Sequence, residues 1–383
     1  MFCKAKHRRR GQTAKTARQR RRSLAGVVAG VCVMIAGAAA SPAAASPATQ
    51  REVQVLRWFF TWDGAVVAGH GGAAPGGSYD NLFRAGVMAD GPALGLSPAW
   101  QFDATFACTE NGRSISDEVG DIQGVINLDA DSRCRPYTLS AARNFGGLSA
   151  RLGLIPADQY FDVADSCGVL LNSSFGVEPT WSRNTIAPIY PTAGVGAMVT
   201  WRGGAWLDRA GLFQAAPNRL DSAFHEGALF LDEVEYHDAE TGTYKIGLWG
   251  YRPHGGTLGS LPPANWGLYF IAEHSLMMGG TSRATAFLRL GLSPDAASEV
   301  PLDLQAGVAV PAPLPGRPDD QLSLGVAVAE LQDGRTETAI EATYVLAMSG
   351  HVSLQPDLQY VLHPGGIHRP ATVLALRLHL EFD

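Results

Sequence analysis

The last residues of the chain alternate between apolar and polar side chains. From Leu374 to Phe382 every even position is large and apolar, whereas Arg377, His379 and Glu381 can carry charge. A period of two is typical of a β-strand that has one face away from water. The pattern leaves open whether the apolar face packs on a protein core or on lipid.

The same alternation recurs along the second half of the chain, between short segments rich in Gly, Pro and Asp. The spacing of three and four residues that marks amphipathic helices is nearly absent. This arrangement predicts consecutive antiparallel strands joined by hairpins, in one all-β unit that begins at about residue 55. Strands are predicted at residues 193–201, 283–292, 302–310, 322–328, 340–348, 351–363 and 374–382.

The first 45 residues differ from the rest. Residues 1–22 contain ten Lys and Arg and no acid, residues 24–40 are uncharged, and a small-residue A-x-A site follows at Ala43 to Ala45. These are the features of a secretory signal peptide. We therefore divide the chain into a cleaved signal peptide at 1–45, an N-terminal segment at 46–64 that leads into a barrel, and the barrel domain at 65–383.

Charge excludes nucleic acid as a partner. Because residues 1–45 hold ten of the 30 basic residues and none of the 36 acids, the remainder has 20 basic residues and a formal charge of −16. Binding to phosphate requires a basic face. After the signal peptide no stretch approaches the roughly 18 consecutive apolar residues of a membrane-spanning helix, so strands would have to cross any membrane.

The composition of the polar faces favours a membrane barrel over a soluble sandwich. These faces contain Arg, Asp, Gln, His, Ser and much Gly, while Trp201, Tyr360 and Phe382 lie at strand ends. A barrel in lipid has an apolar outer face, a polar interior and aromatic residues at both ends of the lipid band. The predicted fold is all-β, a transmembrane antiparallel up-and-down β-barrel.

Six phrases, in order, carry a resemblance to a known family: LSARLGLIPADQYFD (148–162), LLNSSFG (170–176), IYPTAGVGAMVTW (189–201), GLFQAAP (211–217), WGLYFIAEHSLM (266–277) and SLQPDLQYVLHPGG (353–366). Together they resemble the carbohydrate-selective porins of the OprB type. GHGGAAPGGSYDNLF and VGDIQGVINLDA look like the N-terminal region of the same family. The resemblance spans roughly residues 65–382. Asp383, after the terminal aromatic Phe382, departs from the usual ending of outer-membrane strands.

The resemblance implies a barrel of about sixteen strands in the outer membrane of a Gram-negative bacterium. It implies passive diffusion of sugars such as glucose, and of similar small polar solutes, through a narrow and partly arginine-lined constriction. Expected partners are sugars and outer-membrane lipid, with no cofactor, and a monomer is the starting expectation. The 338 residues after position 45 leave little chain for long loops. The constriction residues lie outside the matching phrases and cannot be transferred.

Alternation offers candidates for the pore wall. If the even leucines of the last strand face lipid, the side chains between them face the lumen, and the same reasoning extends to other strands. The candidates are Arg151, Lys245, Trp249, Tyr251, Arg283, Arg289, Glu341, Gln355, Asp357, Gln359, Arg377, His379 and Glu381. The charged members could select solutes, or pair with one another along the wall. Trp249 and Tyr251 could stack on sugar rings, or pack as structural aromatics.

Catalytic and metal sites are not expected. Common hydrolase, metalloprotease and nucleotide-binding motifs are absent from the sequence. The acids beside His225 and His237 are better interpreted as polar loop or lumen edge than as metal ligands. Cys108 and Cys134 could form a disulfide, or stay as thiols beside Cys167. The alternative to a porin is an exported all-β protein that binds or acts on polysaccharide.

Overall fold

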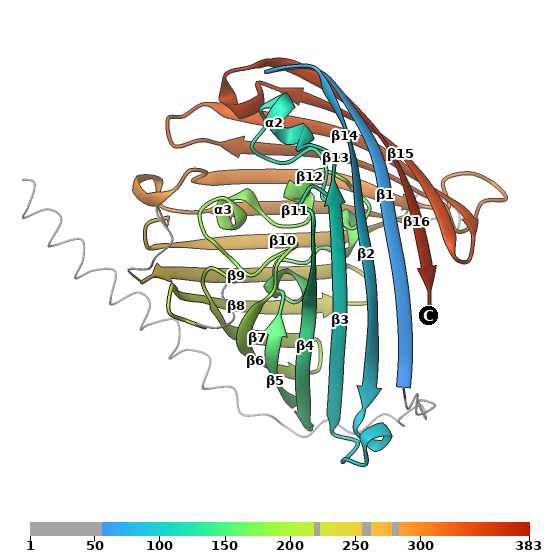
Figure 1. Cartoon of the computed structure of the whole chain (residues 1–383), viewed down its shortest axis with the longest axis vertical. Helices are drawn as coiled ribbons and strands as arrows, with labels where there is room; N and C mark the ends of the chain where they lie inside the picture. The colour runs from blue at the N-terminus through green and yellow to red at the C-terminus, as the bar shows by residue number, and fades with distance from the viewer. Residues whose placement is uncertain (1–55, 218–222, 255–261, 278–282) are drawn as a thin grey trace, which may run out of the picture. The chain divides into compact units, whose positions relative to one another are not determined.

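Sixteen antiparallel strands close into one barrel (Figure 1). The computed structural model describes residues 56–217, 223–254, 262–277 and 283–383, so the predicted signal peptide lies outside the described residues. Each strand pairs with its neighbours in sequence, and β1 pairs with β16 to close the ring. This confirms the predicted all-β barrel of about sixteen strands.

The strands are β1 (Leu56–Gly72), β2 (Gly76–Asp90), β3 (Trp100–Asn111), β4 (Arg133–Phe145), β5 (Leu148–Ile155), β6 (Gly194–Gly203), β7 (Trp206–Gln214), β8 (Gly227–Asp238), β9 (Gly242–Pro253), β10 (Asn265–Met277), β11 (Arg283–Leu292), β12 (Leu302–Pro311), β13 (Gln321–Glu330), β14 (Thr336–Ser349), β15 (Val352–Leu362) and β16 (Arg369–Phe382). The short helices are η2 (Gly91–Leu94), α2 (Ile115–Val119), η3 (Ala157–Gln159), η4 (Asp165–Cys167), η5 (Ser173–Phe175), α3 (Pro179–Ser182), η7 (Asp295–Ala297) and η8 (Pro364–Gly366). Among the described residues, no helix has the length and apolar character to cross a membrane.

Alternation along each strand separates an outer from an inner face. On β16, Leu374 is 57% exposed, whereas its neighbour Val373 is buried. On β1, Val66 is exposed and Val67 is buried. The apolar outer positions lie on the surface of the barrel, as expected for a barrel whose outer face contacts lipid.

The first strand begins at Leu56, next to the predicted start of the all-β unit at about residue 55 and before the barrel boundary placed at residue 65. Leu56 starts β1, so part of the 46–64 segment, expected only to lead into the barrel, belongs to its first strand. Alternation is weak in this strand because its buried inner positions include Ala65 and Val67, which are as apolar as the outer positions.

Two connections are long, contrary to the expectation of short ones. Residues 112–132, here called the first inward segment, join β3 to β4 and contain α2. Residues 156–193, the second inward segment, join β5 to β6 and contain α3. Both segments form buried apolar clusters with inner-face residues of the wall. They therefore occupy the interior of the barrel, where long connections add no external bulk.

A disulfide lies at the base of the first inward segment. Cys108 of β3 is bonded to Cys134 of β4, and the two residues are direct partners in the strand pairing. Of the two alternatives from the sequence, the structure has the bridge, while Cys167 is a buried free cysteine. The bridge fixes the two strand ends from which the first inward segment departs.

Candidate functional site

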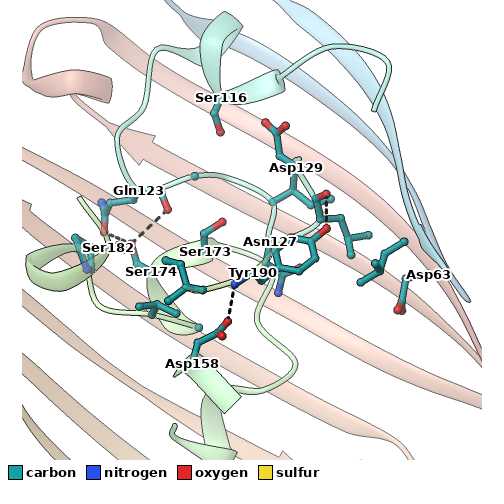
Figure 2. Close-up of a pocket in the computed structure, with 18 of the residues that line it drawn as sticks. Asp63, Ser116, Gln123, Asn127, Asp129, Asp158, Ser173, Ser174, Ser182 and Tyr190 are labelled. Carbon is teal, nitrogen blue, oxygen red and sulfur yellow. Dashed lines mark hydrogen bonds between the residues drawn. The ribbon is translucent and has the colours of Figure 1, made fainter. Parts of the chain in front are cut away.

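A cavity of ≈ 570 Å³ lies between the two inward segments and one side of the barrel wall. Its wall side is formed by residues of β1, β2, β4 and β16, including Asp63, Arg84 and Arg377. Its other sides come from the inward segments (Figure 2). Hydroxyl, amide and charged groups make up much of the lining. A cavity with these groups suits a small polar solute.

The seam between β1 and β16 brings charged groups to the cavity. Asp63 is buried, and its Oδ1 accepts hydrogen bonds from Arg377 Nε at 2.9 Å and Nη2 at 2.5 Å. His379 Nδ1 lies 2.7 Å from the same oxygen. Asp63 Oδ2 has no hydrogen-bond partner among the described residues. Because strand pairing places Asp63 opposite His379, barrel closure itself builds this cluster.

Arg84 is a second cationic group on the cavity wall. It lies on β2, and its Nε donates to Thr61 Oγ1 at 3.3 Å. Among the described residues no carboxylate is close enough to form an ion pair with it. A guanidinium presents several N–H donors in one plane, which fits neighbouring hydroxyl groups of a solute.

Asp158 and Tyr190 line the cavity from the second inward segment. Asp158 Oδ2 accepts from the Tyr190 backbone N–H at 3.0 Å, as Figure 2 shows. Tyr190 Oη donates to the Leu128 carbonyl at 3.0 Å and so joins the two inward segments. Burial raises the pKa of Asp158 to about 6. This carboxyl group therefore changes charge in a mildly acidic range.

Asp129 lines the cavity from the first inward segment. Ser114 Oγ donates to its Oδ2 at 2.5 Å, and Asn111 Nδ2 donates to its Oδ1. Burial raises the pKa of Asp129, although these two hydrogen bonds oppose the shift. The cavity thus carries both signs of charge, with arginines on the wall and acids on the wall and segments.

Buried polar side chains of the wall fasten the first inward segment. Glu337 of β14 accepts the backbone N–H groups of Ile122 at 2.9 Å and Gln123 at 3.1 Å. Gln359 of β15 donates to the Val125 carbonyl at 2.8 Å. These bonds satisfy backbone groups that water cannot reach.

A larger set of wall residues fastens the second inward segment. Arg289 of β11 has no exposed surface; it donates to Asp162 Oδ1 at 2.7 Å and to the carbonyls of Ser174 and Phe175. Glu341 of β14 accepts the backbone N–H groups of Leu171 and Asn172. The segment is therefore attached to β11 and β14.

The structure separates the predicted pore-wall residues into three groups. Arg377 lines the cavity, with His379 beside it. The inward segments or their own neighbours cover a second group, which comprises Arg151, Lys245, Trp249, Tyr251, Arg289, Glu341, Gln355, Asp357 and Gln359. Arg283 and Glu381 lie exposed near strand ends.

Within the covered group the contacts are specific. Lys245 Nζ donates to the Val163 carbonyl at 2.8 Å, and Gln355 donates to the Val169 carbonyl. Arg151 stacks over the Tyr160 ring. Trp249 and Tyr251 are 1% and 2% exposed and belong to the apolar cluster around the second inward segment. This placement favours the packing interpretation of the two aromatics over sugar stacking.

Sequence reasoning missed most residues that line the cavity. Asp63 and Arg84 lie on the first two strands, which are not among the strands predicted from alternation. Asp129, Asp158 and Tyr190 lie on connections, which have no period to interpret. The available signal was the matching phrases: LSARLGLIPADQYFD contains Asp158, IYPTAGVGAMVTW contains Tyr190 and VGDIQGVINLDA contains Asp129, but the resemblance assigned none of them a role.

Comparison with known proteins identifies relatives of the chain. A family model described as carbohydrate-selective porin, OprB family, matches residues 74–382. A search of curated proteins finds no match. The fold is similar to the high-pH structure of Pseudomonas putida OprB, at 17% identity and a TM-score of 0.76, over 86% of this chain and 94% of that chain.

Two further solved porins share the fold. The anion-selective porin from Comamonas acidovorans has 14% identity and a TM-score of 0.57, with 85% of this chain and 99% of that chain covered. A mutant of Rh. blastica porin has 11% identity and a TM-score of 0.55, with 86% of this chain and 100% of that chain covered. At these identities the likeness shows a common fold.

Proposed function

Because the chain belongs to the carbohydrate-selective porin family of the OprB type, we propose that the cavity between the inward segments and the β1–β2–β16 wall is its sugar path. Sugars cross the outer membrane by passive diffusion, and the proposed solutes are glucose-like sugars and similar small polar molecules. The family implies a channel and not an enzyme.

The observation that carries this proposal is the lining of the cavity. Hydroxyl and amide groups of the inward segments, which Figure 2 shows, line one space together with guanidinium and carboxylate groups of the wall. Sugar hydroxyls both donate and accept hydrogen bonds, so a path with both kinds of partner lowers the cost of removing water from the solute. Weak and multiple contacts also allow the solute to leave.

Roles for the lining residues follow from their positions. Arg84 and Arg377 are proposed to donate hydrogen bonds to solute hydroxyls, while the buried carboxylate of Asp63 holds Arg377 in place. The covered group of predicted pore-wall residues is proposed to act indirectly, by fixing the segments that narrow the path. In this arrangement Arg377 both lines the path and pairs with Asp63 of the wall, whereas Arg289 pairs with Asp162 of the second inward segment.

The topology supports an orientation in the membrane. The ends of β1 and β16 that carry the chain termini lie at the same barrel end as the short connections 146–147, 204–205 and 350–351. In bacterial outer-membrane barrels short turns face the periplasm and longer loops face outward. We propose export through the signal peptide at 1–45 and a path that one chain suffices to form.

Liposome swelling tests the proposed path. Purified protein in liposomes should permit swelling with glucose and not with larger oligosaccharides. Ser173→Trp places a bulky ring on the cavity lining and should slow glucose-driven swelling several-fold. The matched control, Leu376→Phe, changes an outward apolar position and should swell at the wild-type rate. Absence of swelling in the wild type, or equal swelling with Ser173→Trp, would contradict this path.

A further inference from the structure

Three oxygen atoms converge above Gly291 on the inner face of β11. A Cβ added to Gly291 would lie 2.1 Å from Thr180 Oγ1, 2.3 Å from Asp303 Oδ2 and 2.6 Å from Glu178 Oε2. Two of these side chains belong to the second inward segment, and Asp303 belongs to β12 of the wall. The absence of a side chain at Gly291 leaves room for this meeting of oxygens.

Two of the three side chains have no partner for the oxygens that point there. Glu178 is 1% exposed, and neither of its carboxylate oxygens has a hydrogen-bond partner among the described residues. Thr180 is buried, and its Oγ1 is likewise unpartnered within the described part of the chain. A buried polar atom without a partner costs roughly 1–3 kcal/mol, and more if it is charged. The native state therefore requires something that contacts these oxygens.

The local charge is unbalanced in the negative direction. Arg289 forms its short ion pair with Asp162 at 2.7 Å, and its Nε lies 3.8 Å from Glu178 Oε1, too far for a hydrogen bond. One guanidinium thus faces three carboxylates when Asp303 is included. Arg209 on β7 already pairs with Glu233 at 2.8 Å and contributes no spare positive charge. When Glu178 and Asp303 are both ionised, two negative charges remain to be compensated.

We propose that a calcium ion binds to Glu178, Thr180 and Asp303 and fastens the second inward segment to the barrel wall. Calcium prefers carboxylate, hydroxyl and water oxygens and takes six to eight of them at 2.3–2.6 Å. Its double charge balances the two uncompensated carboxylates. Because the added Cβ position is only one bond from Gly291 Cα, the ion lies farther out among the oxygens.

The site differs from clusters of acids and histidines that bind metals through three or more such groups. The described residues contain no group of three or more His, Cys, Asp and Glu side chains arranged to bind a metal. Here the third protein ligand is the hydroxyl of Thr180. Val177 and Pro179, which flank Glu178, line the cavity, so loss of the ion loosens the cavity wall.

Calcium titration of the purified full chain in detergent tests the proposal. After treatment with EDTA, addition of calcium in a fixed excess of KCl should raise the melting temperature of the wild type. Glu178→Gln keeps the shape of the side chain and removes its charge. It should bind calcium at least about tenfold more weakly, since ligand charge sets affinity, and should melt no lower than wild type without calcium. Thr180→Val should weaken binding to a smaller extent.

Glu341→Gln is the matched control. Glu341 is another buried glutamate that contacts the second inward segment, but backbone N–H groups already bind both its oxygens. This variant should retain the wild-type calcium shift. An equal shift in Glu178→Gln and wild type, or no shift in wild type, overturns the proposal. The measurement uses no solute, so its result is independent of the proposed sugar path.

Discussion

At the scale of single residues, the two faces of a strand were predictable and the partners of a side chain were not. Alternation placed Arg289 and Arg377 on the polar face of their strands, and both lie on the inner face. Arg289 is nevertheless buried under the second inward segment, whereas Arg377 lines the cavity. The difference arises from residues more than 70 positions away in the sequence, which no local pattern reports.

Asp158 gives a prediction for pH. Because burial raises its pKa to about 6 from an ordinary value near 4, the native state binds this proton more tightly than the unfolded chain. Stability should therefore fall as pH rises from about 4 to about 6. Over the same range the cavity gains one negative charge, so the cation-to-anion permeability ratio should rise with a midpoint near pH 6, measured as reversal potential in planar bilayers.

Asp158→Asn supplies the control for this titration. The amide retains the shape of the side chain and carries no charge, so the step near pH 6 should disappear. Asp129, the other acid whose pKa is raised at the cavity, remains in this variant. A step that persists in Asp158→Asn would assign the titration to Asp129 or to another group and contradict the prediction.

At the scale of elements, the second inward segment is the feature that shapes the interior. Its apolar residues Phe161, Phe175 and Trp181 pack against inner-face residues of the wall, including Trp249. Phe161 meets Phe213, and Phe175 meets Phe287, in edge-to-face contacts. The segment thus makes a protein core inside a barrel whose outer face is also apolar.

Arg289 tests how much the segment depends on its wall contacts. Arg289→Met removes a buried charge that binds Asp162 and two backbone carbonyls. Loss of one partner of a buried pair costs about 3–5 kcal/mol. The variant should have a lower free energy of unfolding in urea, and its single-channel conductance should rise because the segment no longer narrows the interior.

Arg283→Met is the comparison for that experiment. Arg283 lies on the same strand, at its exposed start. Its replacement should change stability by less than about 0.5 kcal/mol, the usual range for surface positions. Equal effects of the two substitutions would show that the contacts of Arg289 do not fasten the segment.

At the scale of the whole molecule, the outer face predicts how the barrel responds to charge. Leu376 lies in the middle of β16 and is 48% exposed. Leu376→Arg introduces a charge that costs roughly 2–4 kcal/mol at the midplane of a bilayer. The variant should assemble poorly in the outer membrane, measured as the heat-modifiable, folded fraction on gels.

Leu376→Ala separates charge from lost apolar volume. It keeps the outer face uncharged and should assemble at close to the wild-type level. Normal assembly of Leu376→Arg would mean that this face does not contact lipid, and would count against the membrane setting of the barrel.

The sequence by itself determined the all-β class, the barrel, the strands of the second half and the family. The strands follow from the local period of two, and the family follows from short matching phrases. Both are local features of the sequence, and each predicted strand pairs with its neighbours along the chain. The predicted strands at 283–292, 302–310 and 340–348, for example, are β11, β12 and part of β14.

Only the tertiary structure decided which inner-face residues reach the cavity. Closure of β1 on β16 brings Asp63 to Arg377 and His379, which lie more than 300 positions away. Two connections without any period enter the interior and cover Arg289, Glu341 and Gln359. The alternation along a strand shows which side chains lie on the inner face. Whether those side chains reach the cavity depends on which distant segment packs against them.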